Sequence, residues 1–274
     1  MSNIRPEATI TVPVDLYNPG EFFACCGLLE LAHSLTKPGS RALGWFENMD
    51  VSRSHFSINA FKDGAPLTIE GIIESLKRCE ISTNKPDSKE GPVLLGSPFN
   101  IILDWRPPFP QCKMIKTFTG NQSLLEIVRT LHQAIHEISV NEFVGSELLG
   151  IRKPTNRAVT SFDIEKAEDA IDAGFSMDVQ KGRLFRHSRV FLELLALIGG
   201  QRFCPQQGEE RLERIYFAWQ IPLPVSLASS AISRNIPAIP ANGYSFRMYK
   251  REASGKYKGF STARKLLNKQ GGNK

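Results

Sequence analysis

The sequence lacks the features of a secreted, disulfide-bonded or membrane-spanning protein. It has five cysteines, an odd number, and none of them forms a Cys-x-x-Cys pair, which argues against a disulfide framework and a zinc ribbon. The N-terminal residues show no charged segment followed by an apolar one, so no signal peptide is expected. The longest apolar runs, Phe22–Leu31 and Val190–Ile198, are too short to span a bilayer and contain Glu30 and Glu193. We therefore expect a cytoplasmic protein that does not contact a membrane.

The sequence also lacks the motifs of common enzymes. It contains no Gly-x-Gly-x-x-Gly or Gly-x4-Gly-Lys-Ser/Thr loop for phosphates and no Gly-x-Ser-x-Gly elbow for a serine nucleophile. His132 and His136 have the spacing of two metal ligands, but no third ligand is evident, and the favoured interpretation is two polar residues on an exposed helix face. An acidic cluster has the composition of a magnesium site or of a solvated helix face; it comprises Glu165, Glu168, Asp169 and Asp172. We predict a protein that is not an enzyme and holds no metal or cofactor.

What the sequence does have is positive charge concentrated at one end. The net charge is +6, but residues 234–274 contain ten Lys or Arg and a single acid, Glu252. This segment therefore carries a net charge of +9, and residues 1–233 sum to −3. A mildly acidic body with a strongly basic end is typical of a protein that meets a polyanion on one surface.

Two segments are apolar on nearly every side, which predicts helices buried in the core, at Glu21–Leu35 and Arg189–Ile198. Asn18 is expected to cap the first helix, with a glutamate three residues later as in a capping box. Ser188 is expected to cap the second helix, and Gly199-Gly200 to end it.

Further helices and strands lie between and after these two segments. Amphipathic helices are expected at Thr68–Cys79 and Gln122–Ile138. Short alternating runs predict strands, at Ala8–Leu16, Ala42–Phe46, His55–Ala60, Val93–Leu95, Phe99–Trp105 and Ile215–Gln220. Strands scattered among helices favour an α+β fold of mixed short strands and buried core helices. We expect an α+β core domain at residues 1–205, with the basic region 206–274 packed on it or continuous with it.

The basic end is predicted to form a β-hairpin. Tyr244–Arg251 alternates, residues 252–255 can turn, Lys256–Phe260 returns, and a short helix, Thr262–Asn268, follows. Alternation places aromatic and cationic side chains together on one face, where cations bind phosphates and rings stack on unpaired bases.

Two further basic segments, Gly150–Arg157 as a loop and Lys181–Arg189, are secondary candidates for the same role. The complete set of candidate nucleic-acid-binding residues comprises Arg152, Lys153, Arg157, Arg183, Arg186, Arg234, Arg247, Tyr249, Lys250, Arg251, Lys256, Tyr257, Lys258, Arg264 and Lys265.

Several stretches over nearly the whole chain occur together in an order and spacing more specific than any single motif. They are NPGEFFACCGLLEL (18–31), GFSMD (174–178), ELLALIGGQRF (193–203), AWQIPLP (218–224), YSFR (244–247) and GKYK (255–258). In these stretches the chain resembles the short large-subunit-type protein of type I-U (also called I-G) CRISPR systems.

This resemblance implies a non-catalytic subunit of an RNA-guided surveillance complex of the Cascade kind, acting in antiviral defence. Its expected partners are CRISPR RNA (crRNA), target DNA, the backbone and repeat-handling subunits of Cascade, and a recruited helicase–nuclease. Large subunits of this type help to recognise the short motif beside the target and hold the displaced strand.

Two alternative functions remain open at this point. The chain could be a guide-RNA-processing ribonuclease that uses His187 or the His132/His136 pair. It could instead be a protein-interaction subunit whose basic end docks an acidic partner. The aromatic segment Phe99–Pro110 would suit such a protein contact.

Overall fold

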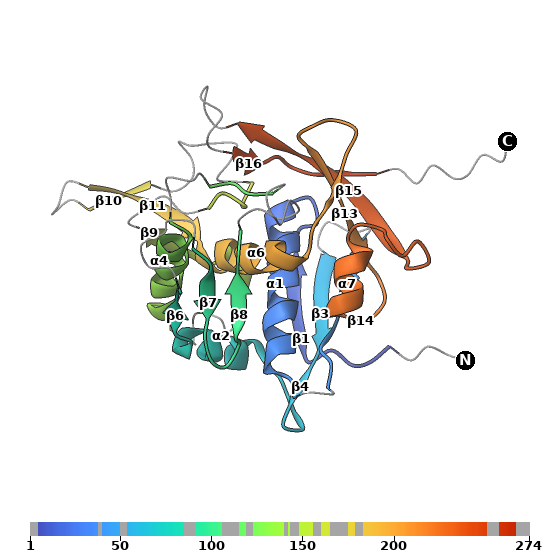
Figure 1. The fold of residues 1–274 in the computed structure, drawn as a ribbon, viewed down its shortest axis with the longest axis horizontal. Coiled ribbons are helices and arrows are strands. Elements are labelled where there is room, and N and C mark those ends of the chain that lie inside the picture. Colours follow the sequence, from blue (N-terminus) through green and yellow to red (C-terminus); the bar gives the residue numbers. More distant parts are fainter. Residues whose placement is uncertain are drawn as a thin grey trace.

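Two apolar helices, α1 (Pro19–Leu35) and α6 (Val190–Arg202), cross at the centre of the computed structural model (Figure 1). They touch backbone to backbone, because glycines stand at the crossing. A β-carbon built at Gly27 would lie 2.0 Å from the carbonyl oxygen of Leu195, and one at Gly199 would lie 2.1 Å from that of Phe23. No other residue type can occupy these two positions without moving the helices apart.

The structure describes residues 5–37, 40–49, 54–84, 91–105, 115–118, 123–139, 142, 148–155, 160–164, 175–178, 183–250 and 258–266. For residues 175–178, 183–186, 250 and 258 it describes the backbone alone. No helix within these ranges is long and apolar enough to cross a membrane.

The start of α1 is capped by Asn18 as predicted, but Glu21 does not have the predicted role in a capping box. Asn18 Oδ1 accepts a hydrogen bond from the backbone N–H of Gly20 at 3.0 Å. Glu21 does not complete a capping box: its Oε2 accepts from the N–H of Asp15 at 2.7 Å, and its Oε1 pairs with Arg189. The carboxylate is therefore used to bind the preceding loop and a distant residue together.

The capping residue and the C-terminal end predicted for α6 were wrong, although its predicted start lies within one residue of the observed one. Arg189, not Ser188, is the N-cap, and it makes no side-chain capping bond. The helix continues through Gly199-Gly200 to Arg202. The glycines do not end the helix because Gly199 is needed for the close contact with α1, and tertiary packing overrides its weak helix propensity.

A four-stranded antiparallel sheet of order β1-β3-β2-β14 packs against α1 (Figure 1). Its strands are β1 (Ile10–Val14), β3 (Ser54–Asn59), β2 (Leu43–Glu47) and β14 (Leu223–Pro224). Because β14 pairs with β2, a strand from the C-terminal region completes the N-terminal sheet. The buried core cluster likewise contains residues from both 1–205 and 206–274.

A second antiparallel sheet is formed by the C-terminal region, with order β12-β13-β15-β16 and β17 also paired to β15. Its strands are β12 (Gln206–Gln207), β13 (Glu213–Trp219), β15 (Ala241–Lys250), β16 (Lys258–Phe260) and β17 (Arg264–Lys265). The predicted hairpin is present as β15 and β16, with Met248 opposite Phe260. The predicted helix Thr262–Asn268 is wrong over its described part, because Arg264 and Lys265 add a strand to the exposed edge of β15.

The remaining elements surround the two central helices. The helices are α2 (Ile69–Arg78), α4 (Leu124–His136), the 3-10 turn η2 (Leu148–Gly150) and α7 (Val225–Ala231). The strands are β4 (Phe61–Lys62), β5 (Ala65–Pro66), β6 (Ile81–Ser82), β7 (Val93–Leu95), β8 (Ile101–Leu103), β9 (Arg152–Thr155), β10 (Phe175–Asp178) and β11 (Arg183–Arg189).

The α+β prediction is confirmed: within the described residues, five α-helices alternate irregularly with short antiparallel strands in small sheets. The predicted loop Gly150–Arg157 was wrong over residues 152–155, which form β9 and pair with β11.

Candidate nucleic-acid interface

The C-terminal sheet has one buried face and one outer face, as the alternation predicted. Tyr244, Phe246 and Met248 are buried and pack toward α1, where Phe246 lies 6.4 Å from the ring of Phe23. Residues that face one another across an antiparallel pair share a side of the sheet. The register therefore assigns to the outer face the pairs Glu213–Arg247, Ile215–Ser245, Phe217–Gly243 and Arg264–Ser245.

Three exposed arginines from separate segments of the chain meet on this outer face. Arg247 belongs to β15 and Arg264 to β17, both exposed. Arg234 reaches the face from the loop after α7, and its guanidinium carbon lies 5.2 Å from the ring centre of Phe217. Tyr249 follows Arg247 on the same face and is half-buried. The outer face thus unites Arg234, Arg247, Tyr249 and Arg264.

Arg234 is held over Phe217 by the way α7 ends. Its φ of 50° lies in the left-handed region, and its N–H donates to the carbonyl of Ala231 at 2.9 Å. A left-handed residue just after a helix turns the chain back across the helix end. The carbonyl oxygen of Ile232, two residues earlier, accepts from the N–H of Phe217 at 3.0 Å, so this end of α7 lies on β13 and Arg234 can make the cation–π contact.

A groove of about 420 Å³ runs between Arg247 and Arg264. Besides the two arginines, it is lined by Ser261 and Thr262 and by the acids Glu210 and Glu213. Arg247 forms an ion pair with Glu210, and both side chains remain more than half exposed at 62% and 61%. The groove therefore contains guanidinium and hydroxyl groups; Arg247 is paired with a carboxylate, and the Ser261 hydroxyl donates to the carbonyl oxygen of Thr262 at 3.1 Å.

These two acids were not among the residues predicted from the sequence. They stand in the Gly-Glu-Glu-Arg-Leu-Glu stretch 208–213, outside the basic segment, and only the pairing of β13 with β15 brings them beside Arg247. The acidic stretch immediately before a predicted strand is the signal that could have identified them.

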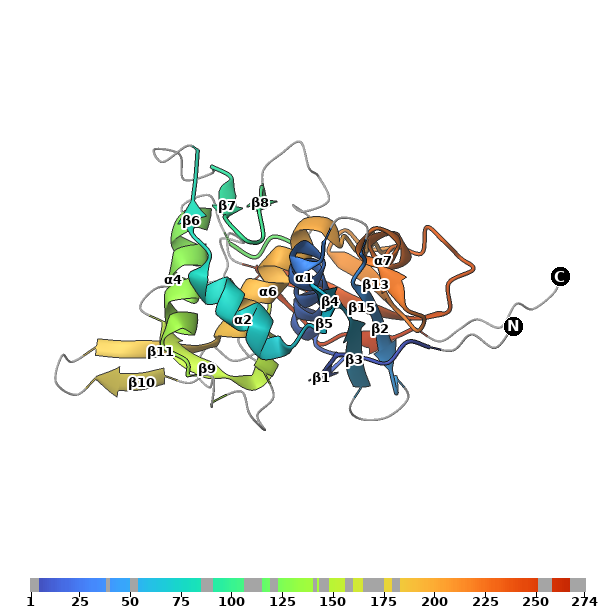
Figure 2. The same cartoon turned by 90° about the horizontal axis from the view of Figure 1, so that it is seen from below.

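The other predicted basic residues do not join this face. Lys265 lies opposite Tyr244 and so faces the other side of the sheet. Arg152, Lys153, Arg183 and Arg186 belong to the separate sheet β10-β11-β9. Both views show β10 and β11 at one end of the longest axis, with α6 and α1 between them and the labelled strands β13 and β15 (Figures 1 and 2). The sequence prediction therefore combined two distinct basic regions.

In the second basic region, Arg152 is exposed, whereas Lys153 pairs with Glu142 at 2.8 Å. The hydrogen bond from Lys153 lowers the pKa of the Glu142 carboxyl. For Lys250 and Lys258 the structure gives the backbone, in which they face one another across the hairpin. Four predicted site residues lie outside the described residues: Arg157, Arg251, Lys256 and Tyr257. The acidic cluster of Glu165, Glu168, Asp169 and Asp172 lies outside them too.

The predicted placement of the histidine pair on an exposed helix face was wrong for His132. His136 is exposed, but His132 is half-buried, and its Nε2 lies 2.8 Å from the carbonyl oxygen of Leu76 at the end of α2. Burial lowers the pKa of His132 below its ordinary value of 6.5. Among the described residues, no group of three His, Cys, Asp or Glu side chains could hold a metal ion.

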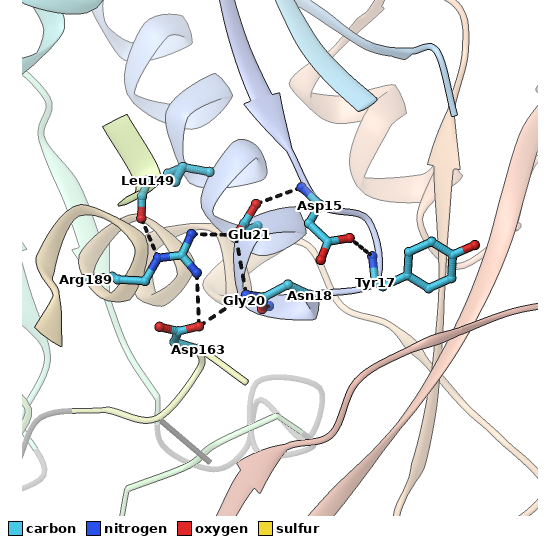
Figure 3. A network of polar contacts seen from close by, with 8 residues as sticks. All are labelled: Asp15, Tyr17, Asn18, Gly20, Glu21, Leu149, Asp163 and Arg189. Carbon is cyan, nitrogen blue, oxygen red and sulfur yellow. Dashed lines mark hydrogen bonds and ion pairs between the residues drawn. The ribbon is translucent and has the colours of Figure 1, made fainter. Parts of the chain in front are cut away.

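Arg189 belongs to the basic run Lys181–Arg189 but is an internal residue. Its guanidinium donates to the Leu149 carbonyl oxygen at 2.7 Å and to Asp163 Oδ1 at 3.2 Å, and it pairs with Glu21 (Figure 3). Burial raises the pKa of Glu21, and the attraction of Arg189 opposes that shift. This network joins α1, α6 and the segment around Asp163, so it is part of the scaffold.

The aromatic segment considered for a protein contact also contributes to the core. Trp105 is 2% exposed and packs against Phe118 and Phe162, with ring centres 5.9 and 6.0 Å away. Phe109 lies outside the described residues.

Comparison of the chain with protein-family models, with curated proteins and with solved structures finds no match in any of the three.

Proposed function

We propose that this protein is a non-catalytic, nucleic-acid-binding subunit of an RNA-guided surveillance complex of the Cascade kind. In this proposal the outer face of the C-terminal sheet contacts the sugar–phosphate backbone of crRNA or target DNA. The observation that supports it best is the meeting of Arg234, Arg247 and Arg264 on one sheet face. The resemblance of six stretches of the chain to the short large-subunit-type proteins supports the assignment to a CRISPR complex.

The chemistry of the groove suits phosphate oxygens. A guanidinium presents several N–H donors in a planar fork that matches a phosphate group, and hydroxyl groups add single donors. Arg247 and Arg264 supply guanidinium donors around one groove, which Ser261 and Thr262 also line. Contacts of this kind carry affinity without base sequence, which is what a subunit that accepts different guides requires.

The test is a charge-removing triple variant with a matched control. Arg234, Arg247 and Arg264 are replaced together by Gln. In the control, the exposed arginines Arg41, Arg78 and Arg129, which lie outside the outer face, are replaced in the same way. Binding of labelled RNA and DNA is measured by fluorescence anisotropy over a range of salt concentrations.

We expect the outer-face variant to bind RNA and DNA more weakly, and its affinity to depend less on the salt concentration. The slope of log K against log[salt] should fall by about 0.7 for each lost contact to a single strand. The control should lose much less affinity. Equal losses in the two variants would indicate that only net charge matters, and an absence of binding by the unaltered protein would overturn the proposal.

Membership in a surveillance complex is tested by co-expression with the genes that neighbour it. The proposal requires a CRISPR array and a helicase–nuclease beside the gene, and co-purification of the chain with crRNA and the other subunits. Precursor repeat RNA incubated with the protein should remain intact. Specific cleavage that is lost on replacing His187 by Ala would instead support the ribonuclease alternative.

A further inference from the structure

Tyr17 is an exposed aromatic residue at the edge of the C-terminal sheet. It lies in the short link between β1 and α1, and the residue is 44% exposed. Its N–H donates to Asp15 Oδ1 at 2.8 Å, and its carbonyl oxygen accepts from the N–H of Ala263 at 2.7 Å. Figure 3 shows its ring pointing away from the buried network of Arg189. The backbone of Tyr17 is thus attached to the sheet while its ring faces solvent.

The ring of Tyr17 packs against a second tyrosine. Its centre lies 5.8 Å from that of Tyr244 in a T-shaped arrangement, and Tyr244 in turn stacks on Tyr216 at 5.5 Å. Tyr216 is fully buried, and its hydroxyl donates to the carbonyl oxygen of Leu16. A row of three rings therefore runs from the core to the surface, and Tyr17 is its exposed end.

Tyr17 lies beside β17, which carries one cationic residue on each side of the sheet. Ala263, which binds the Tyr17 backbone, directly precedes Arg264 and lines the groove with it. Lys265 lies opposite Tyr244, the ring on which Tyr17 packs, so Lys265 and Tyr17 share that side of β15. An aromatic ring beside a cation is the arrangement by which proteins bind unpaired nucleotides: the cation meets a phosphate, and the ring stacks on a base.

We infer that Tyr17 is a stacking platform for an unpaired base, so that the basic edge of the sheet takes single-stranded nucleic acid in preference to duplex. This inference rests on the proposed function and adds its substrate class. A base inside a duplex is stacked on its neighbours and cannot cover the ring, whereas the bases of a single strand can. On the side of Tyr17, Lys265 is the cation of β17 that can meet a phosphate, and Arg264 with the groove lies across this edge strand on the outer face.

The chain provides a matched control for this residue. Phe61, in the β4–β5 hairpin, is 43% exposed, almost the same as Tyr17, but it lies outside the C-terminal sheet. The variants are Tyr17→Ala, Tyr17→Leu, Tyr17→Phe and Phe61→Ala. Leucine keeps apolar contact with Tyr244 but has no π-face. If Tyr17→Ala does not fold, Tyr17→Leu therefore still tests whether the aromatic ring stacks on a base.

Binding is measured by anisotropy with single-stranded RNA, single-stranded DNA and a duplex of the same length. Tyr17→Ala and Tyr17→Leu should bind the single strands about 5- to 100-fold more weakly and the duplex unchanged. Tyr17→Phe and Phe61→Ala should bind like the unaltered protein. The salt dependence should be unchanged in all four variants because none removes a charge, and the relative losses with RNA and DNA identify which strand is held.

The outcomes separate the two proposals. If the unaltered protein and the arginine variant behave as proposed but Tyr17→Leu binds single strands normally, the stacking inference is wrong and the proposed function stands. An equal loss with duplex and single strand also contradicts it. If the unaltered protein binds no nucleic acid, the proposed function fails, and the inference fails with it.

Discussion

At the scale of single residues, two arginines show how surroundings set the role of one side chain. Arg189 is 8% exposed and its guanidinium is surrounded by the Leu149 carbonyl, Asp163 and Glu21. Arg247 is mostly exposed and shares one ion pair with Glu210. A buried charge that loses its partner is strongly destabilising, whereas an exposed ion pair contributes little to stability. The first arginine therefore supports the fold, and the second can exchange its partner.

Replacing Arg189 by Met should lower the free energy of unfolding by about 3–5 kcal/mol, because two buried carboxylates lose their counter-charge. Adding Glu21→Gln and Asp163→Asn should recover much of this loss, since no uncompensated charge then remains. Urea denaturation of the single and triple variants measures both values. An equal loss in the two would mean that packing around Arg189, and not its charge, stabilises the network.

Replacing Glu210 by Gln should strengthen nucleic-acid binding by about 1.5- to 5-fold, because an exposed ion pair on Arg247 no longer competes with phosphate. The gain should vanish when Arg247 is already Gln. Glu209→Gln, the same change at the exposed neighbouring position, is the control for net charge. A gain that persists without Arg247 would contradict the competition.

The free energy of unfolding should fall as the pH drops below the ordinary histidine value of 6.5. Burial lowers the pKa of His132 and of His33 in the folded state, so the unfolded chain binds more protons and acid favours unfolding. Burial raises the pKa values of Glu21 and Glu30, which acts in the opposite direction at lower pH. The measurement is therefore the free energy of unfolding of the unaltered protein and of His132→Gln, each followed over pH. Between about pH 7 and 5, the free energy of unfolding of the variant should change less than that of the unaltered protein.

At the scale of elements, the local sequence predicted helices better than strands. The ranges predicted for α2 and α4 agree with the structure within two residues, because a cap and an apolar period are both local signals. The strands β9 and β17 were missed: β9 contains Pro154, and β17 is a two-residue strand that exists because β15 has a free edge. The end of α6 was misplaced because Gly199 is used for contact with a helix distant in sequence.

Replacing Gly199 by Ala should destabilise the protein by at least about 1–3 kcal/mol, since the new methyl group would press on the backbone of α1. Gly71, inside α2, is the control: a β-carbon there meets only Thr68 Oγ1 at 3.5 Å and Leu67 Cδ1 at 4.0 Å. Gly71→Ala should be neutral or stabilise by up to about 1 kcal/mol, because alanine favours helix. Urea denaturation measures the free energy of unfolding of both variants. Similar decreases in the two would show that the close crossing of α1 and α6 does not explain the effect of Gly199→Ala.

At the scale of the whole molecule, the sequence by itself determined the α+β class, the two core helices and the hairpin with its buried and outer faces. These follow from apolar periodicity and alternation, which every segment carries locally. Only the tertiary structure decided which charges share a surface. It separated the basic residues of β9 and β11 from those of the C-terminal sheet and placed Glu210 on Arg247. It also brought Tyr17 to an edge more than 240 positions away in the sequence. Strand pairing joins residues that no local pattern relates, and a charge acts through its neighbours in space rather than along the chain.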